Sequence, residues 1–324
     1  MKRKLVLRKE YRKCIEQAKR RSNDELIKNS KNPSRTMWNI INSNKQNRNA
    51  AKTTTLTPNE FNNNFCDAPL SIVNSIPPAP SNPHTLVTRV DVSHVDEHFY
   101  FCQISESTLR NTICSLPRRK GKDLLGLNLD IILVVEDLIA PPLTKLINKC
   151  LATGIFPDSL KHGLIHPVYK NKGDVNDASM FRPITILPTL GKIFEKIITE
   201  QITSYLTYSN LFSPNQFGFR KSLCTTDAVN FFSKFISNSF NEKTYLYATM
   251  CDLSRAFECL SHDVFLAKLK HYKLDSTSIK LLSSYLEGRT HRVQLGEKTS
   301  DARSVTTGIP TGSIQGLNRC SLYT

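Results

Sequence analysis

The segment Thr244–Asp252 predicts a β-strand that ends on a carboxylate. Its residues alternate between two faces, and Leu246, Ala248, Met250 and Asp252 share one of them. An acid at the tip of a strand is suited to Mg²⁺, because hard cations take oxygen ligands and Mg²⁺ sites use one or two carboxylates. A single Asp in this place is also typical of a helix cap or a turn. The pattern therefore predicts one strand of a sheet. Whether Asp252 binds a metal depends on which other residues lie near it.

Length and charge limit the fold and the kind of partner. The chain has 324 residues, of which 39% are hydrophobic, enough for one large or two ordinary domains with an apolar core. Its formal charge is +16 and its pI is about 9.5, which favours a polyanionic partner such as nucleic acid. Residues 1–50 hold fifteen Lys/Arg and four Asp/Glu, so 15 − 4 = +11 of this charge lies there. A solvated basic helix without a partner is the alternative.

Cysteines and hydropathy indicate the compartment. The nine cysteines form no CxxC pair, so neither a zinc module nor a disulfide framework is predicted, and reduced thiols are expected. No signal-peptide core and no run of 18 apolar residues is present. We expect an intracellular protein, in the nucleus or the cytoplasm, that is neither secreted nor membrane-spanning.

The chain divides by composition into three regions. Residues 1–50 predict a basic helical linker, with one helix in the first twenty residues and another at Ser34–Ile41. Residues 51–100 are rich in Asn, Ser and Pro and predict a flexible segment, with room for a short helix at Pro58–Phe65. Residues 101–324 return to an ordered pattern.

The ordered region mixes helices with strands irregularly, which favours an α+β fold over a regular βαβ series. Strands are expected at Gly163–Lys170 and Thr244–Asp252, with a hairpin from Arg292–Leu295 to Arg303–Thr306. The helices are expected at Glu106–Ser115 (capped by Ser105), Pro141–Leu151, Thr189–Tyr208, Thr225–Asn238, His262–Tyr272 and Ser276–Leu286.

Four segments in order resemble the reverse transcriptases of non-LTR retrotransposons, particularly the jockey-like group. They are LKHGLIHPVYKNKGDVNDASMFRPITILPTLGKIFEKI, LFSPNQFGFRKSLCTTDAV, DLSRAFECLSHDVFLAKL and TGIPTGSIQG, which begin at Leu160, Leu211, Asp252 and Thr307. The resemblance implies a right-hand polymerase, with fingers and a partial palm built from mixed helices and a small antiparallel sheet, preceded by the basic helical linker. It implies an RNA template, a DNA primer and dNTP as partners.

The resemblance also implies roles for individual residues. Arg182 of FRPI, with Lys170 or Lys172, would face the triphosphate, which needs cations around it; ordinary surface charge is the alternative for the lysines. Gln216, Gly218 and Arg220 of NQFGFR, with Asn215, would contact the template, or form a turn at a helix start. Phe257 would lie beneath the sugar and exclude a 2′-hydroxyl, although alone it reads as a core Phe. Gly312 would lie in the nucleotide site.

The family mechanism is two-metal phosphoryl transfer. Asp252 and the backbone carbonyl of Leu253 would be Mg²⁺ ligands, and the family supplies two further acids from a Tyr-X-Asp-Asp hairpin. The sequence contains no Asp-Asp pair, Thr311 stands where the family usually has Gln, and Glu258 replaces the usual Asp. These departures predict a truncated polymerase that makes no cDNA alone. A non-catalytic nucleic-acid-binding remnant and a pseudogene product are the alternatives.

Overall fold

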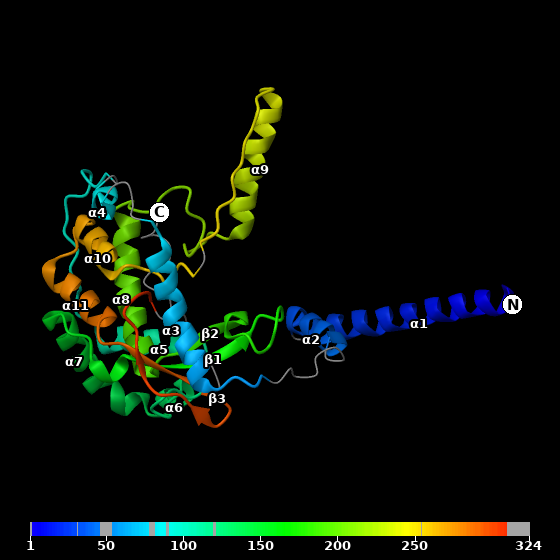
Figure 1. Cartoon of the computed structure of the whole chain (residues 1–324), viewed down its shortest axis with the longest axis horizontal. Coiled ribbons are helices and arrows are strands. Elements are labelled where there is room, and N and C mark those ends of the chain that lie inside the picture. Colours follow the sequence, from blue (N-terminus) through cyan, green and yellow to red (C-terminus); the bar gives the residue numbers. More distant parts are fainter. Residues whose placement is uncertain are drawn as a thin grey trace. The chain divides into compact units, whose positions relative to one another are not determined.

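The computed structural model describes residues 2–30, 32–45, 54–77, 82–88, 91–118, 121–253 and 255–309. The chain forms two compact units, Met1–Thr55 and Leu56–Thr324, and each is described by itself. The first unit contains α1 (Lys2–Lys28) and α2 (Pro33–Lys45), so both helices predicted there are confirmed (Figure 1). None of the helices in the described ranges has the length and apolar composition that crossing a bilayer requires.

The helix α3 (Pro58–Ser75) belongs to the second unit. It begins at the first residue of the short helix expected at Pro58–Phe65, and it continues through part of the segment predicted to be flexible. Thr57 caps it: the Thr57 side chain accepts from the N–H of Glu60 at 3.3 Å, and the Glu60 carboxylate accepts from the N–H of Thr57 at 2.6 Å. Phe61 is fully buried and its ring meets Phe181 edge-on at 4.8 Å. The apolar residues of its first turns anchor the helix on the sheet, whereas its Asn-rich composition concealed how far the helix extends. A second helix of this region, α4, covers Pro83–Val87.

The main core of the second unit is helical. Its central element is α8 (Thr189–Tyr208), whose bounds match the prediction, and whose apolar stripe is almost completely buried. Phe194 of α8 stacks on Phe156 at a centroid distance of 5.1 Å. The other helices are α5 (Glu106–Ser115), α6 (Leu129–Val134), α7 (Glu136–Thr153), α9 (Thr225–Asn241), α10 (His262–His271) and α11 (Ser276–Leu286), with 3-10 turns at Asp158–Leu160 and Ala178–Met180.

The sheet is mixed, and the prediction of an antiparallel sheet was wrong for one pairing. Its strands are β1 (His162–Tyr169), β2 (Phe181–Ile186), β3 (Thr290–Leu295), β4 (Lys298–Thr299) and β5 (Arg303–Ser304). Their order is β2-β1-β3-β4, with β5 also on β3. The β1–β2 and β3–β5 pairs are antiparallel, whereas β1 and β3 are parallel. A parallel pair needs a long crossover, which the helices between β1 and β3 supply.

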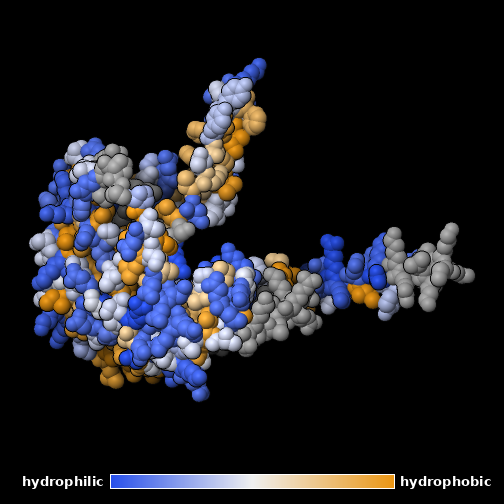
Figure 2. Space-filling view, in the orientation of Figure 1, coloured by the Kyte–Doolittle hydropathy of each residue, from blue (hydrophilic) through white to orange (hydrophobic). Residues whose placement is uncertain are grey.

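The strand predicted at Thr244–Asp252 does not form. This segment has no regular secondary structure and its side chains are exposed, with Tyr245 and Tyr247 more than 90% accessible. Alternation of side chains supplies only one requirement of a strand, and no described strand lies alongside to accept its backbone hydrogen bonds. The preceding helix α9 likewise has no buried residue, and Figure 2 shows apolar side chains along its length.

Candidate active site

Asp252 and Leu253 lie in the exposed segment that follows α9. Asp252 is therefore not at a strand tip, and Leu253 is 73% accessible. Among the described residues, no three His, Cys, Asp or Glu side chains lie close enough together to hold a metal ion. One carboxylate and one carbonyl are too few ligands for two ions. The donors in the described ranges thus do not fit a two-metal centre, and Gly312 lies outside those ranges.

Phe257 lies in a loop that is joined to the segment Thr307–Ile309. The Ile309 N–H donates to the Phe257 carbonyl at 2.8 Å, and the Gly308 N–H donates to the Leu260 carbonyl at 3.0 Å. The Thr307 hydroxyl donates to the Glu258 carbonyl at 3.1 Å. Two motifs far apart in the sequence are therefore held together by hydrogen bonds to main-chain carbonyls.

Gly308 is required by the geometry of this junction. Its φ is +79°, and a Cβ there would lie 2.5 Å from the Glu258 carbonyl oxygen. An L-residue is disfavoured at such a φ, and the backbone on the other side of the contact cannot move away as a side chain would. The positive φ and the close backbone contact therefore explain why glycine occupies this position of the TGIP motif.

Lys170 lies beside Arg182 in a basic cluster. Lys170 follows β1 and its N–H donates to the Met180 carbonyl, while Arg182 stands on the neighbouring strand, opposite Val168. The Lys170 ammonium donates to the Ser179 carbonyl at 2.6 Å. Partial burial, and then the positive charges of Arg255 and Arg182, lower the pKa of Lys170 from its ordinary value. Lys170, Lys172, Arg182 and Arg255 form the cluster, which can attract a polyanionic group.

Arg255 belongs to this basic cluster, although the sequence analysis did not predict it as a site residue. It lies three residues after Asp252 within DLSRAF, where a cation inside an acidic motif was the available signal. Its guanidinium pairs with the Glu258 carboxylate at 3.2 Å. Burial raises the pKa of Glu258, and the charge of Arg255 opposes that rise. Glu258 therefore orients Arg255 beside Lys170.

The NQFGFR segment lies next to Phe257, but its polar residues also hold the loop itself. The Gln216 amide donates to the Gly218 carbonyl at 3.2 Å, and Gln216 is buried. The Arg220 guanidinium donates to the Ser213 carbonyl at 3.1 Å and lies 5.3 Å above the Phe212 ring. The predicted turn is thus confirmed, and a template contact by these residues stays a prediction.

Gly218 and Phe219 are the open positions of this loop. A Cβ on Gly218 would meet no atom within 4 Å, so a ligand backbone has room to approach. Phe219 is half exposed at φ +59°, and its ring meets the Phe257 ring edge-on at 6.3 Å. Phe219 was not predicted as a site residue, although an aromatic residue flanked by Gly and Arg was a visible signal.

Comparisons with known proteins agree on one family. Residues 169–324 match the model of "Reverse transcriptase (RNA-dependent DNA polymerase)". The chain is similar to the "Probable RNA-directed DNA polymerase from transposon X-element" of Drosophila melanogaster, with 30% identity over 181 residues, 56% of this chain and 20% of that protein. It is also similar to the RNA-directed DNA polymerase from the mobile element jockey of the same species, with 28% identity over 218 residues, 66% of this chain and 23% of the relative. The chain therefore spans about a fifth of the length of these relatives.

Proposed function

We propose that the chain contributes the fingers and part of the palm of an RNA-directed DNA polymerase of the non-LTR retrotransposon type, because residues 169–324 match the reverse transcriptase family and the similar proteins are polymerases of such elements. In this proposal β1 and β2 with the NQFGFR loop belong to the fingers, and the loop from Asp252 to Leu260 with Thr307–Ile309 belongs to the palm. The single observation that carries it is the junction of Phe257 with Ile309, next to Phe219.

The substrates follow from the chemistry around that junction. The cluster of Lys170, Arg182 and Arg255 would receive the triphosphate of a dNTP, because cations stabilise charge on a transferring phosphoryl group. Phe257 would lie against the sugar. The RNA template would pass Gly218, where the surface is open. A DNA primer would complete the substrate set.

Divalent metal ions are generally used by reverse transcriptases, and Mg²⁺ is the ion we expect here. Asp252 and the Leu253 carbonyl are the proposed ligands from this chain. The described residues do not complete the set. Asp252 would thus supply one carboxylate of the metal site.

Nucleotide binding by the Arg182→Met variant tests the assignment. We expect the affinity for dNTP, measured by fluorescence titration in the presence of primer–template and MgCl₂, to fall about tenfold, as expected when a charged hydrogen bond is lost. Arg292→Met is the matched control, because Arg292 is an exposed arginine of β3 outside the cluster. Equal losses in the two variants would contradict a specific role of Arg182.

A second candidate function is nucleic-acid binding without catalysis, and α1 favours it. This helix carries eleven Lys/Arg and four Asp/Glu. Phosphate contacts release counterions, so log K should fall with log salt by about 0.9 for each neutralised phosphate on duplex DNA. The double variant Arg20→Gln, Arg21→Gln should reduce that slope by one to two phosphates. A salt-independent affinity of the intact chain would contradict this function.

A further inference from the structure

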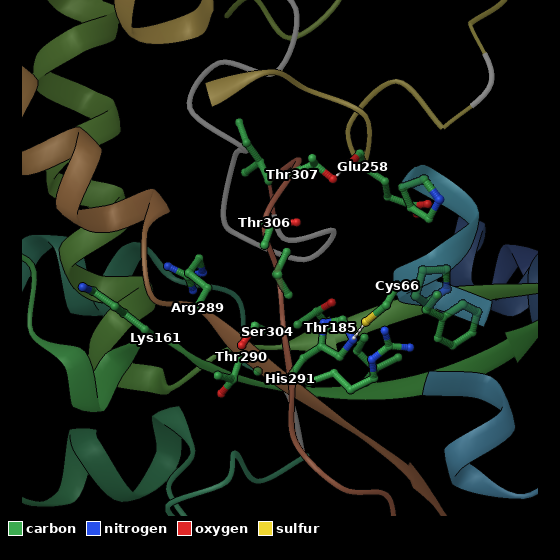
Figure 3. A pocket seen from close by; sticks show the side chains of 18 of the residues that line it. Cys66, Lys161, Thr185, Glu258, Arg289, Thr290, His291, Ser304, Thr306 and Thr307 are labelled. Atoms are coloured by element: carbon green, nitrogen blue, oxygen red, sulfur yellow. Dashed lines mark hydrogen bonds between the residues drawn. The ribbon is translucent and has the colours of Figure 1, made fainter. Parts of the chain in front are cut away.

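A cavity of about 250 Å³ lies between α3, the sheet and the Thr306–Ile309 segment. Figure 3 shows Lys161 and Arg289 on one flank of this cavity and Cys66 with His291 on another. Its remaining lining is largely apolar and includes Phe65, Leu70, Ile165, Leu187, Val305 and Ile309. A concave, mostly apolar cavity with a few polar groups is the usual form of a small-molecule site.

Arg289 contributes a buried cation with an unsatisfied donor. Its side chain is 3% accessible, lies 4.7 Å from the Tyr285 ring centroid and donates through Nη1 to the Tyr285 carbonyl at 2.9 Å. The Nη2 atom is buried and has no hydrogen-bond partner in the described part of the chain. A buried donor without an acceptor is unfavourable, so an incoming oxyanion would satisfy it.

Lys161 adds a second buried cation next to Arg289. Its side chain is 6% accessible, and its ammonium pairs with Asp158 at 2.7 Å. The ammonium lies 4.0 Å from where a Cβ of Gly288, the neighbour of Arg289, would be. An ammonium has three N–H donors, so the pair with Asp158 leaves capacity for a ligand.

The other charged groups of the cavity are already engaged. The Arg303 guanidinium donates to the Asp67 carboxylate at 2.8 and 3.2 Å and to Asn63 at 3.1 Å. Glu258, the one acid among the described residues that line the cavity, is paired with Arg255. Burial and the charge of Arg303 lower the pKa of His291 to about 4, so its imidazole is neutral at pH 7.

We propose that this cavity binds a small ligand with one aromatic-sized apolar body and one oxyanion, which Arg289 Nη2 and the Lys161 ammonium receive. The apolar body lies against the Phe65, Leu70 and Ile165 side. The proposal does not depend on polymerase activity, because none of its cations belongs to the Lys170 cluster.

Cys66 reports occupancy of the cavity. Its thiol lines the wall and lies 3.3 Å from His291 Nε2. Burial raises the pKa of Cys66, so alkylation at neutral pH is slow and easy to follow. Cys102 and Cys114 are exposed and lie outside the cavity lining, so they serve as internal controls.

The experiment uses phenyl phosphate as probe and iodoacetamide as label, with site-resolved mass spectrometry of the intact chain after digestion. We expect saturating phenyl phosphate to slow Cys66 alkylation at least fivefold and to leave Cys102 and Cys114 unchanged. Benzyl alcohol, which has the ring without the oxyanion, should protect much less.

One variant and its matched control test the Lys161 cation. Lys161→Met should weaken phenyl phosphate binding, measured by titration calorimetry, about tenfold. Lys280→Met is its control, because the Lys280 ammonium contacts the Thr153 carbonyl outside the cavity. Both variants should unfold at the wild-type temperature within a few degrees. Unchanged Cys66 alkylation in phenyl phosphate, equal protection by benzyl alcohol, or equal affinity of the two variants would each overturn the proposal.

Discussion

The N–H of Ile309 donates to the carbonyl of Phe257 at 2.8 Å, and this bond joins two motifs that are distant in the sequence. The same junction contains the left-handed Gly308 between the contacts from Thr307 and Ile309. The loop that contains Phe257 is therefore positioned by main-chain hydrogen bonds.

Gly308→Ala should destabilise the second unit by roughly 2–4 kcal/mol, because it combines an unfavourable φ with a backbone clash. Urea denaturation followed by circular dichroism measures the change. Gly296→Ala is the matched control: it also has a positive φ, but its Cβ would meet nothing within 4 Å, so about 1–2 kcal/mol is expected. Equal effects would show that the contact with Glu258 is unimportant.

Phe61→Ala should destabilise the second unit by about 3–5 kcal/mol, because a fully buried aromatic side chain is lost from the α3–sheet interface. Leu70→Ala on the same helix is the control, since Leu70 is 36% accessible and should cost much less. Thermal unfolding measures both. A wild-type melting temperature for Phe61→Ala would indicate that α3 does not pack stably against the sheet.

His291 should make stability depend on pH between about 6.5 and 4. Its pKa is about 4 in the folded chain and 6.5 when unfolded, so the unfolded state binds more protons in this window and stability falls as pH falls through it. The loss reaches at most roughly 3 kcal/mol near pH 4. His291→Gln should flatten the profile, measured by denaturant titration at each pH, whereas the exposed His84→Gln should not.

The purified chain should not extend a primer on an RNA template in MgCl₂. Asp252 has no two acidic neighbours in the described ranges, and the sequence has no Asp-Asp pair. Incorporation of labelled dNTP measures this, with a full-length relative as positive control. Extension that is lost in Asp252→Ala would show that a complete metal site does form.

Gly218→Ala should leave stability unchanged within about 0.5 kcal/mol, because its Cβ would meet no atom. If the template passes this position, affinity for primer–template should nevertheless fall, and fluorescence anisotropy measures it. Gly121→Ala is a control outside the NQFGFR loop. Wild-type affinity in Gly218→Ala would place the template elsewhere.

Elements with local signals were predictable from the sequence. The bounds of α8 and α11 match because an apolar stripe fixes the face and, in α11, Asp275 caps the first turn. Ser105 predicted the start of α5 in the same way. Gly154 ends α7 in a left-handed conformation, as expected for a helix C-terminus.

Elements that depend on distant partners were not predictable. Thr244–Asp252 has strand-like alternation but no strand beside it. β2 was not predicted, because its strand conformation depends on hydrogen bonds to β1, which the sequence of β2 does not reveal. The parallel pairing of β1 with β3 depends on the helices that connect them. In the site, the sequence predicted that Lys170 and Arg182 act together, whereas the contact of Phe257 with Thr307–Ile309 and the positions of Arg255 and Phe219 depend on loop geometry.

The sheet order has a practical consequence for dissecting this protein. The family match begins at Tyr169, which is the last residue of β1, and β1 lies between β2 and β3. A fragment cut at the boundary of the match would lack the strand to which both neighbours are hydrogen-bonded, and it would also lack α3, α5 and α7. We therefore expect that the smallest fragment able to fold independently is longer than the matched segment 169–324. Fragments made for such experiments should start before Leu56, so that they keep the whole second unit.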